Sequence, residues 1–171
     1  MSDGRCYILD ANVFIQAKNE YYAFAFCPGF WQALIQNHAL GRVRSVDKVL
    51  GELVDYGDEL SVWVKNTMPT DCFLSTESEE IAVAYGTIMD WVTGNDQFMQ
   101  YAKDAFATEQ DAWIAAYALV HGHTVVTQEV HHPKRRNKVS LAHVCEHFGI
   151  RYINTFTLLR ELNVSMVCPD D

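Results

Sequence analysis

A chain of 171 residues, 49% of them hydrophobic, can bury one substantial core but has little length for two domains. Its formal net charge of -9 argues against nonspecific binding of polyanions by the whole surface, although a local basic patch can still bind one. No apolar stretch has the length of a membrane span, the N-terminus lacks a signal-peptide layout, and the five cysteines form no CxxC pair. We therefore expect a single cytoplasmic domain over residues 1–171, without a membrane partner, a zinc site or a disulfide framework.

The first predicted strand is the unbroken apolar run at residues 6–9, which stops at Asp10. Such a run is typical of a strand buried on both faces, as in a parallel sheet. Asp10 and Asn12 favour a tight turn, so we expect a helix to begin at Val13. Ligands of open α/β sheets bind at the carboxyl ends of strands, which makes Asp10 a site candidate; the alternative is that it only caps the helix.

Aromatic residues crowd the next segment, between Tyr21 and Trp31. The pattern predicts a packed loop that leads into a helix over residues 30–40, closed by Gly41. These rings could stack nucleobases, but core packing is favoured because apolar residues surround them and no basic residues are interleaved. Any rings that stay exposed here would favour a homodimer.

The clearest amphipathic pattern follows, with apolar residues at helical spacing at Val46, Val49, Leu50, Leu53 and Val54. Ser45 stands where an N-cap is expected. Glu52 lies about 60° around the helix from Val49, on the margin of the apolar stripe, and can therefore reach a cleft. The alternative is a solvated flank residue like its acidic neighbour Asp55.

A buried helix is predicted after Thr108. Before it, residues 72–74 predict a short strand or an extended link, and a helix that begins at Thr76 or Ser78 continues to Val92. The run AWIAAYALVHGH is apolar almost all round, which is typical of a helix packed against a sheet. Thr108 and Asp111 have the spacing of a capping box, so we expect Asp111 in the first turn. Capping is compatible with function there, because a helix N-terminus stabilises an ionised carboxylate in apolar surroundings.

A short β-branched strand is predicted over residues 124–127, and Glu129 follows its carboxyl end as Asp10 follows that of the first strand. Four basic residues come next within five positions, namely Lys134, Arg135, Arg136 and Lys138. Such a run is usually a solvated loop, but beside an acidic cleft it can hold a phosphate backbone.

The C-terminal part predicts a helix over residues 140–148, a strand over residues 151–153 and a last helix over residues 155–162. His143 and His147 stand four residues apart and could share a metal ion on one helix face. No third potential ligand lies at a spacing typical of a metal site, so a buried or capping role is the default interpretation. The order of strands and helices predicts an α/β fold with a central, mostly parallel sheet.

Four carboxylates stand out by position, at Asp10, Glu52, Asp111 and Glu129. In a parallel sheet, the ends of the elements that carry them can converge on one side. Ionised carboxylates at close range repel one another unless a cation lies among them, and all-oxygen ligation suits Mg²⁺ or Mn²⁺. Divalent ions held by carboxylates activate water for attack on a phosphodiester, so the pattern predicts hydrolysis of nucleic acid.

The motifs YILDANVFI, SVDKVLGELVD, EQDAWIAAYAL and TVVTQE, in this order, resemble those of the PIN-domain superfamily of metal-dependent nucleases. In that family one acid ends the first strand, a second lies on a helix, a third starts a buried helix and a fourth follows a later strand. The matching residues here are Asp10, Glu52, Asp111 and Glu129, with Asn12 and Thr127 as supports of the metal shell. The segments FCPGFW and HVCEHFGIRYINTFTLL look like a prokaryotic branch of PIN-like proteins, some of which are paired with antitoxin-like neighbours.

The resemblance implies a three-layer α/β/α fold and a Mg²⁺- or Mn²⁺-dependent endoribonuclease, the toxin of a toxin–antitoxin pair with RNA as substrate and an antitoxin as partner. Asp10, Glu52 and Asp111 would be catalytic metal ligands, and Glu129 a further ligand or the base that orients water. Many relatives carry Asp followed by a further acid where this chain has Glu129. The basic loop, residues 134–138, would clamp phosphate.

Two other interpretations stay open. The first is a catalytically inert PIN-like module that binds RNA or protein, for which Asp10→Asn would change no phenotype. The second is an unrelated small α/β enzyme or nucleotide binder. No motif supports the second, because the nine glycines form neither a GxGxxG nor a GxxxxGK loop and the chain has no GxSxG elbow.

Overall fold

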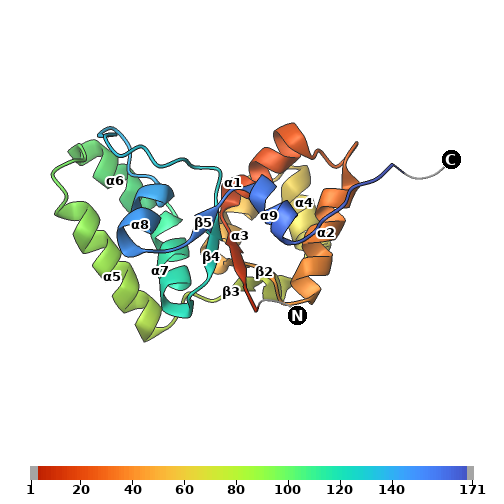
Figure 1. Ribbon diagram of the computed structural model, residues 1–171, viewed down its shortest axis with the longest axis horizontal. Coiled ribbons are helices and arrows are strands. Elements are labelled where there is room, and N and C mark those ends of the chain that lie inside the picture. The colour runs from red at the N-terminus through yellow and green to blue at the C-terminus, as the bar shows by residue number, and fades with distance from the viewer. Residues whose placement is uncertain (1–3, 169–171) are drawn as a thin grey trace.

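A single five-stranded sheet lies at the centre of the computed structural model, which describes residues 4–168 (Figure 1). The strand order is β3-β2-β1-β4-β5, and every neighbouring pair runs parallel. The strands are β1 (Tyr7–Leu9), β2 (Val43–Val46), β3 (Phe73–Leu74), β4 (Thr124–Val126) and β5 (Tyr152–Ile153). The predicted α/β class with a parallel sheet is thereby confirmed.

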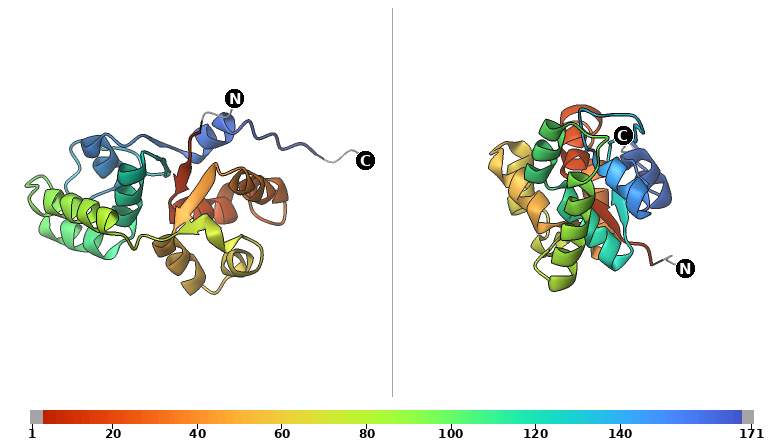
Figure 2. Two further views of the ribbon diagram at one scale, coloured as in Figure 1. Left: turned by 90° about the horizontal axis from the view of Figure 1, so that it is seen from below. Right: turned by 90° about the vertical axis from the view of Figure 1, so that its left-hand side faces the viewer.

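Helices flank the sheet on both sides, which gives three layers, α/β/α (Figures 1 and 2). One layer contains α1 (Ala11–Gln16), the π-helical turn η1 (Ala17–Tyr21), α2 (Pro28–Ala39), α3 (Asp47–Asp55), α4 (Glu59–Asn66) and α9 (Thr155–Glu161). The other contains α5 (Glu79–Thr93), α6 (Gln100–Thr108), α7 (Asp111–His121) and α8 (Leu141–Phe148). A 3₁₀ turn, η2 (Thr70–Cys72), leads into β3. No helix in the described part of the chain is long and apolar enough to cross a membrane.

The strand order reverses between β1 and β4. From β1 the chain builds outwards to β2 and β3 on one side, and it later returns to place β4 and β5 on the other. The helices that follow β1 and β4 therefore lie in opposite layers (Figure 1). A crevice forms at the carboxyl ends of the strands at such a switch point, and ligands of open α/β sheets bind there. Asp10 directly follows β1, and Thr127 directly follows β4.

The two central strands and α7 form the middle of the hydrophobic core. Ile8 and Leu9 of β1, like Val125 and Val126 of β4, have no exposed surface, because helices cover both faces of the sheet. α7 packs against α5, α8, β2 and β4 at once. This surrounding explains why α7 is apolar on all sides rather than along one stripe.

The aromatic segment packs into the core, as its apolar surroundings predict. Phe30 and Trp31 of α2 are at most 2% exposed, and Trp31 Nε1 donates a hydrogen bond to the carbonyl of Tyr22 at 2.7 Å. The Phe24 ring stacks on Trp31 with 4.1 Å between the ring centroids. Phe26 remains largely exposed, and the homodimer that would cover such rings stays a prediction.

Two residues that the sequence predicts as helix caps, Ser45 and Thr108, belong to other elements. Ser45 lies within β2, a strand that the helical spacing obscured, and its hydroxyl donates to the Leu9 carbonyl at 2.6 Å. α3 then begins at Asp47. Thr108 ends α6, a helix that was not predicted, and its hydroxyl donates to the Ala105 carbonyl at 2.8 Å instead of capping α7. In both places the adjoining element, rather than the predicted helix, determines the conformation of the residue.

The histidines of α8 have structural partners. Ser140 caps this helix and accepts a hydrogen bond from the His143 N–H at 3.3 Å, while His143 Nδ1 accepts from the Ser140 N–H at 3.0 Å. His143 Nε2 lies 2.8 Å from the carbonyl oxygen of His132, so both ring nitrogens are engaged. The His147 ring stacks on Trp91, with 4.4 Å between centroids. These contacts support the capping interpretation over a shared metal ion.

Candidate carboxylate site

An acidic cavity of about 260 Å³ opens at the switch point between β1 and β4. It brings together all four carboxylates that the sequence singled out, although they are carried by separate parts of the chain. The residues that line this acidic cavity are Asp10, Asn12, Glu52, Thr108, Glu109, Gln110, Asp111, Glu129 and Lys138. The parallel sheet thus places the ends of the predicted elements on one side.

Asp10 follows β1 and is only 4% exposed. Its backbone N–H donates to the Val126 carbonyl at 3.0 Å, and its Oδ2 accepts a hydrogen bond from Thr127 Oγ1 at 3.0 Å. Burial raises the pKa of Asp10 to about 7, and the charges of Glu129 and Glu52 act in the same direction, whereas the Thr127 hydrogen bond opposes them.

The position of Asp10 also bears on the alternative that it only caps α1. It does occupy the N-cap position of this helix. Its side chain makes no cap hydrogen bond of the usual kind in the described structure, although a backbone hydrogen bond from Ala11 lowers its pKa. The carboxylate is instead held by Thr127 on the neighbouring strand end, which supports a role in the cavity.

Asp111 is the first residue of α7, as the sequence predicted for a residue of the first turn. Burial raises the pKa of its carboxyl well above the usual range, and the charges of Asp10, Glu129 and Glu109 raise it further. The positive charge of Lys138 acts in the opposite direction. Asp10 and Asp111 therefore destabilise each other when both are ionised, and a cation between them would relieve this repulsion.

Glu52 reaches the acidic cavity from α3 and is partly buried. Burial raises the pKa of its carboxyl. The structure therefore places Glu52 at a cleft rather than on a fully solvated flank, which was the alternative. Asn12, in the first turn of α1, lines the same cavity with an exposed side chain.

Glu129 uses both oxygens of its carboxylate. Oε1 accepts a hydrogen bond from Lys138 Nζ at 2.9 Å, and Oε2 accepts from the Leu141 N–H at 2.7 Å, at the start of α8. The Glu129 N–H donates to Thr127 Oγ1 at 3.2 Å, which links this segment to the hydroxyl that holds Asp10. Glu129 is thus fixed beside the cavity, and Lys138 is the cation that its Oε1 binds.

Lys138 brings positive charge into an otherwise acidic cavity. Burial disfavours its ammonium, but the hydrogen bond and charge of Glu129, with the charges of Glu109 and Asp111, outweigh burial and raise its pKa. The Lys138 side chain is 47% exposed, against 14% for that of Glu129. The ammonium is therefore both paired with the site and accessible from solvent.

The rest of the basic loop lies outside the cavity lining. Lys134, Arg135 and Arg136 are absent from the residues that line the acidic cavity, whereas Lys138 is among them. Arg136 Nε donates to the Gln97 carbonyl at 3.3 Å, and Gln97 Nε2 donates to the Arg135 carbonyl at 2.8 Å. The loop is thus attached to the segment before α6, and three of its four cations do not line the acidic cavity.

The donor chemistry of the cavity fits a hard divalent cation. Within residues 4–168, no group of three or more His, Cys, Asp or Glu side chains is already arranged as metal ligands. The available donors are carboxylate oxygens, and Asp10 and Asp111 repel each other when both are ionised. Mg²⁺ and Mn²⁺ prefer oxygen ligands and would offset this repulsion. Asp10, Glu52 and Asp111 are the residues that could hold such an ion.

Comparison with known proteins places the chain in a family. A family model described as "Domain of unknown function (DUF4411)" matches residues 7–166, nearly the whole chain. The chain belongs to the DUF4411 family. No curated protein and no solved structure matches this DUF4411 protein. The match covers the strands, the helices and all residues of the acidic cavity.

Glu109 is the acidic cavity residue of this DUF4411 protein that sequence reasoning missed; Thr108 and Gln110, also not predicted as cavity residues, line the cavity beside it. Glu109 follows α6 and lies two residues before Asp111, and burial raises the pKa of its carboxyl, with the charges of Glu129 and Glu52 contributing and that of Lys138 opposing. Glu109 could have been identified from the sequence because it is a second acid close to Asp111, just before an apolar helix. That signal was ambiguous because acids are common in the first turns of helices for structural reasons.

Proposed function

We propose that this DUF4411 protein is a PIN-type endoribonuclease that depends on Mg²⁺ or Mn²⁺ and hydrolyses RNA phosphodiesters. The observation that carries this proposal is the convergence of Asp10, Glu52, Asp111 and Glu129 in one cavity at the switch point of the sheet. The resemblance of the four motifs to the PIN-domain superfamily supports it independently. The family description names no activity, so the proposal rests on the site and on these motifs.

The carboxylates of the cavity fall into two groups according to their hydrogen bonds: Glu129 has partners on both oxygens, and the other three are better suited to bind an ion. Asp10, Glu52 and Asp111 would hold the ion, because burial and mutual repulsion favour a cation beside them. A bound Mg²⁺ or Mn²⁺ supplies an activated water and offsets the charge that develops on the leaving oxygen. Thr127 fixes one oxygen of Asp10, which orients the carboxylate before any ion arrives.

Glu129 and Lys138 are suited to the substrate side of the same cavity. Both Glu129 oxygens are occupied, so direct ligation would require Lys138 or the α8 backbone to be displaced. With this pairing intact, Glu129 positions the Lys138 ammonium at the mouth of the cavity, where a substrate phosphate could contact it. The remaining cations of the basic loop would extend that contact along the RNA backbone.

We further propose that the protein is a cytoplasmic toxin whose partner is an antitoxin protein. This proposal rests on the resemblance of FCPGFW and HVCEHFGIRYINTFTLL to a prokaryotic branch of PIN-like proteins. The net charge of -9 is consistent with a substrate that docks through local positive charge rather than through the whole surface.

The decisive experiment is an RNA cleavage assay with purified protein. A mixed-sequence fluorescent RNA is incubated with Mg²⁺, with Mn²⁺ and with chelator, beside the Asp10→Asn and Asp111→Asn variants. We expect cleavage that requires the metal and that falls at least about 100-fold in each variant, equivalent to nearly 3 kcal/mol of transition-state stabilisation. Asp90→Asn, a change of an exposed aspartate on α5, is the matched control and should cleave normally.

The outcomes separate the proposal from an inert module. Equal cleavage by wild type, Asp10→Asn and Asp111→Asn would mean a contaminating or unrelated activity. No cleavage of many RNAs with either metal would favour an inert PIN-like binding module. A calorimetric metal titration of the wild type and of Asp10→Asn then reports whether the cavity binds the ion at all.

A further inference from the structure

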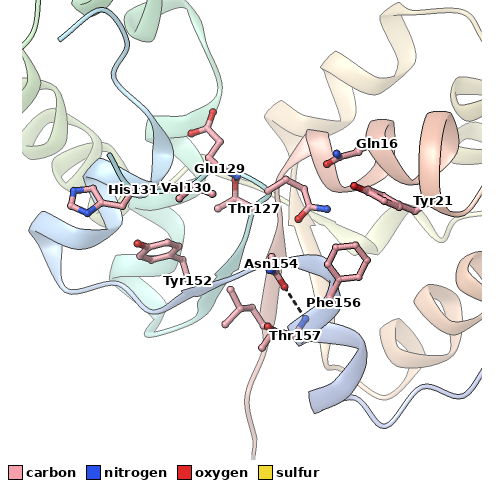
Figure 3. A pocket seen from close by; sticks show the side chains of 12 residues that line it. Gln16, Tyr21, Thr127, Glu129, Val130, His131, Tyr152, Asn154, Phe156 and Thr157 are labelled. Atoms are coloured by element: carbon pink, nitrogen blue, oxygen red, sulfur yellow. Dashed lines mark hydrogen bonds between the residues drawn. The ribbon is translucent and has the colours of Figure 1, made fainter. Parts of the chain in front are cut away.

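A second cavity lies beside the acidic one, at the carboxyl ends of β4 and β5 (Figure 3). Its volume is about 700 Å³, and Glu129 lines both cavities. Thr127 lines the second cavity and donates a hydrogen bond to Asp10 of the acidic one. Ligand sites of this size commonly bind small organic groups. We call it the aromatic cavity, after the phenol and phenyl rings on its wall: Tyr21, Tyr152 and Phe156.

The rings of the aromatic cavity come from different parts of the fold. In Figure 3, Tyr152 lies on one side and Tyr21 and Phe156 lie on the other, with Thr127 and Asn154 between them. Tyr21 and Phe156 meet edge to face, with 5.3 Å between their ring centroids. Tyr21 is 45% exposed and Phe156 36% exposed, whereas the rings of the core are almost fully buried. These side chains therefore offer accessible aromatic surface.

Three neutral amides are among the polar groups of the aromatic cavity, beside the Glu129 carboxylate and the His131 imidazole. Gln128 accepts a hydrogen bond from the Thr155 N–H at 3.4 Å through Oε1, and its amide nitrogen has no partner among the described residues. Gln16 and Asn154 also line the wall. No lysine or arginine is among the lining residues. The lining therefore suits a neutral, flat group with hydrogen-bonding edges better than a phosphate.

We propose that the aromatic cavity binds one unstacked base of a single-stranded RNA, whose neighbouring phosphodiester lies at the acidic cavity. This inference rests on the proposed nuclease function and names the form of its substrate. Glu129 lines both cavities and Thr127 of the aromatic cavity contacts Asp10 of the acidic one, so the two are adjacent and one strand can occupy both. A base paired within a duplex cannot enter such a cavity, whereas the unstacked bases of single strands are recognised by stacking on aromatic side chains.

The test measures binding without cleavage. A labelled single-stranded RNA of mixed sequence is used, and its affinity is measured under conditions that prevent cleavage. The wild type is measured with chelator, and the Asp111→Asn variant is measured with Mg²⁺. The same measurement is made for Tyr152→Ala and Tyr21→Ala, and a duplex of the same sequence is used as a competitor. Tyr56→Ala, which removes an exposed tyrosine at the end of α3, is the matched control.

The proposal predicts that Tyr152→Ala and Tyr21→Ala each weaken binding by about tenfold, whereas Tyr56→Ala has no effect. Tyr152→Phe keeps the ring and should restore affinity, which excludes a general folding defect. An abasic scan of the RNA should locate one position whose base accounts for the loss, and the duplex should compete poorly. In the wild type with metal, the same position should define where the strand is cut.

Failure of this inference can be distinguished from failure of the nuclease function. Metal-dependent cleavage together with unchanged affinity in Tyr152→Ala and Tyr21→Ala would overturn the base subsite and leave the nuclease intact. Base-dependent binding without cleavage would support the subsite in an inert binding module. Absence of any single-strand binding, or equal binding of the duplex, would overturn the base subsite.

Discussion

Thr127 Oγ1 donates a hydrogen bond of 3.0 Å to Asp10 Oδ2 and so joins two strand ends that are 117 residues apart in the chain. The same hydroxyl accepts from the Glu129 N–H at 3.2 Å. One threonine therefore fixes both the buried aspartate and the backbone that carries Glu129. This relationship connects the two sides of the switch point and gives the first prediction.

Thr127→Val should weaken the site without changing its shape. Loss of one buried hydrogen bond costs about 1 kcal/mol of unfolding free energy. Because that bond lowers the pKa of Asp10, its loss should raise this pKa further and move the acidic limb of the pH–rate profile upwards. Loss of an outer support of a metal ligand typically lowers activity about 10- to 100-fold. Urea denaturation and pH-dependent cleavage measure both effects, and Thr127→Ser should behave like the wild type.

The second prediction concerns the pH dependence of stability through Asp10. Its pKa is raised in the folded state from an ordinary 3.8 to about 7, so the folded protein holds this proton more tightly than the unfolded chain. The resulting stabilisation is fully present below about pH 4, declines as the pH rises, and is lost above about pH 7. The difference between the two pKa values corresponds to about 4 kcal/mol.

Asp10→Asn provides the measurement of this effect. Without metal, the variant should be more stable than the wild type at pH 8, and the difference should shrink towards pH 5. Mg²⁺ should raise the melting temperature of the wild type at pH 8 and leave that of the variant nearly unchanged. Equal stability of the two proteins across this range would mean that Asp10 is ionised without cost in the folded state.

Lys138 should compete with divalent cations for the acidic cavity. Lys138→Met removes a charge that lowers the pKa of Asp111, so repulsion among the carboxylates should increase and the metal should bind more tightly. We expect the Mg²⁺ concentration at half-maximal thermal stabilisation to fall about threefold. The pair with Glu129 is partly exposed, so the loss of metal-free stability should stay below about 1 kcal/mol. Lys138→Arg keeps the charge and should need as much Mg²⁺ as the wild type.

The basic loop gives the fourth prediction. The double variant Arg135→Ala with Arg136→Ala should bind RNA more weakly, and its affinity should depend less steeply on salt because fewer phosphate contacts release counterions. A matched double change on other faces, Lys65→Ala with Arg160→Ala, removes the same charge from exposed positions on α4 and α9. If both double variants bind RNA as well as the wild type at low salt, the loop takes no part in binding.

Local pattern was sufficient to predict the strand before Asp10, the buried helix with Asp111 in its first turn, and the helix over residues 140–148. Each is specified by side chains within a few residues, through unbroken apolar runs or a capping residue. The same reasoning predicted the α/β class, because strands that alternate with helices favour a parallel sheet. The order of the acids along the chain is likewise a property of the sequence alone.

Only the tertiary structure decided which side chains meet. Ser45 joined β2 because a neighbouring strand was available for pairing, and the helical spacing around it could not report that partner. Lys138 binds Glu129 because the loop after β4 brings its side chain to the cavity. Glu109 lines the cavity because α6 ends beside it. Contacts between distant residues depend on strand order and on loop paths, which local periodicity does not contain. The sequence by itself determined most of the elements and the candidate acids, because both depend on side chains close together in the chain. Packing of the sheet determined that those acids share one cavity, because it alone brings distant strand and helix ends together.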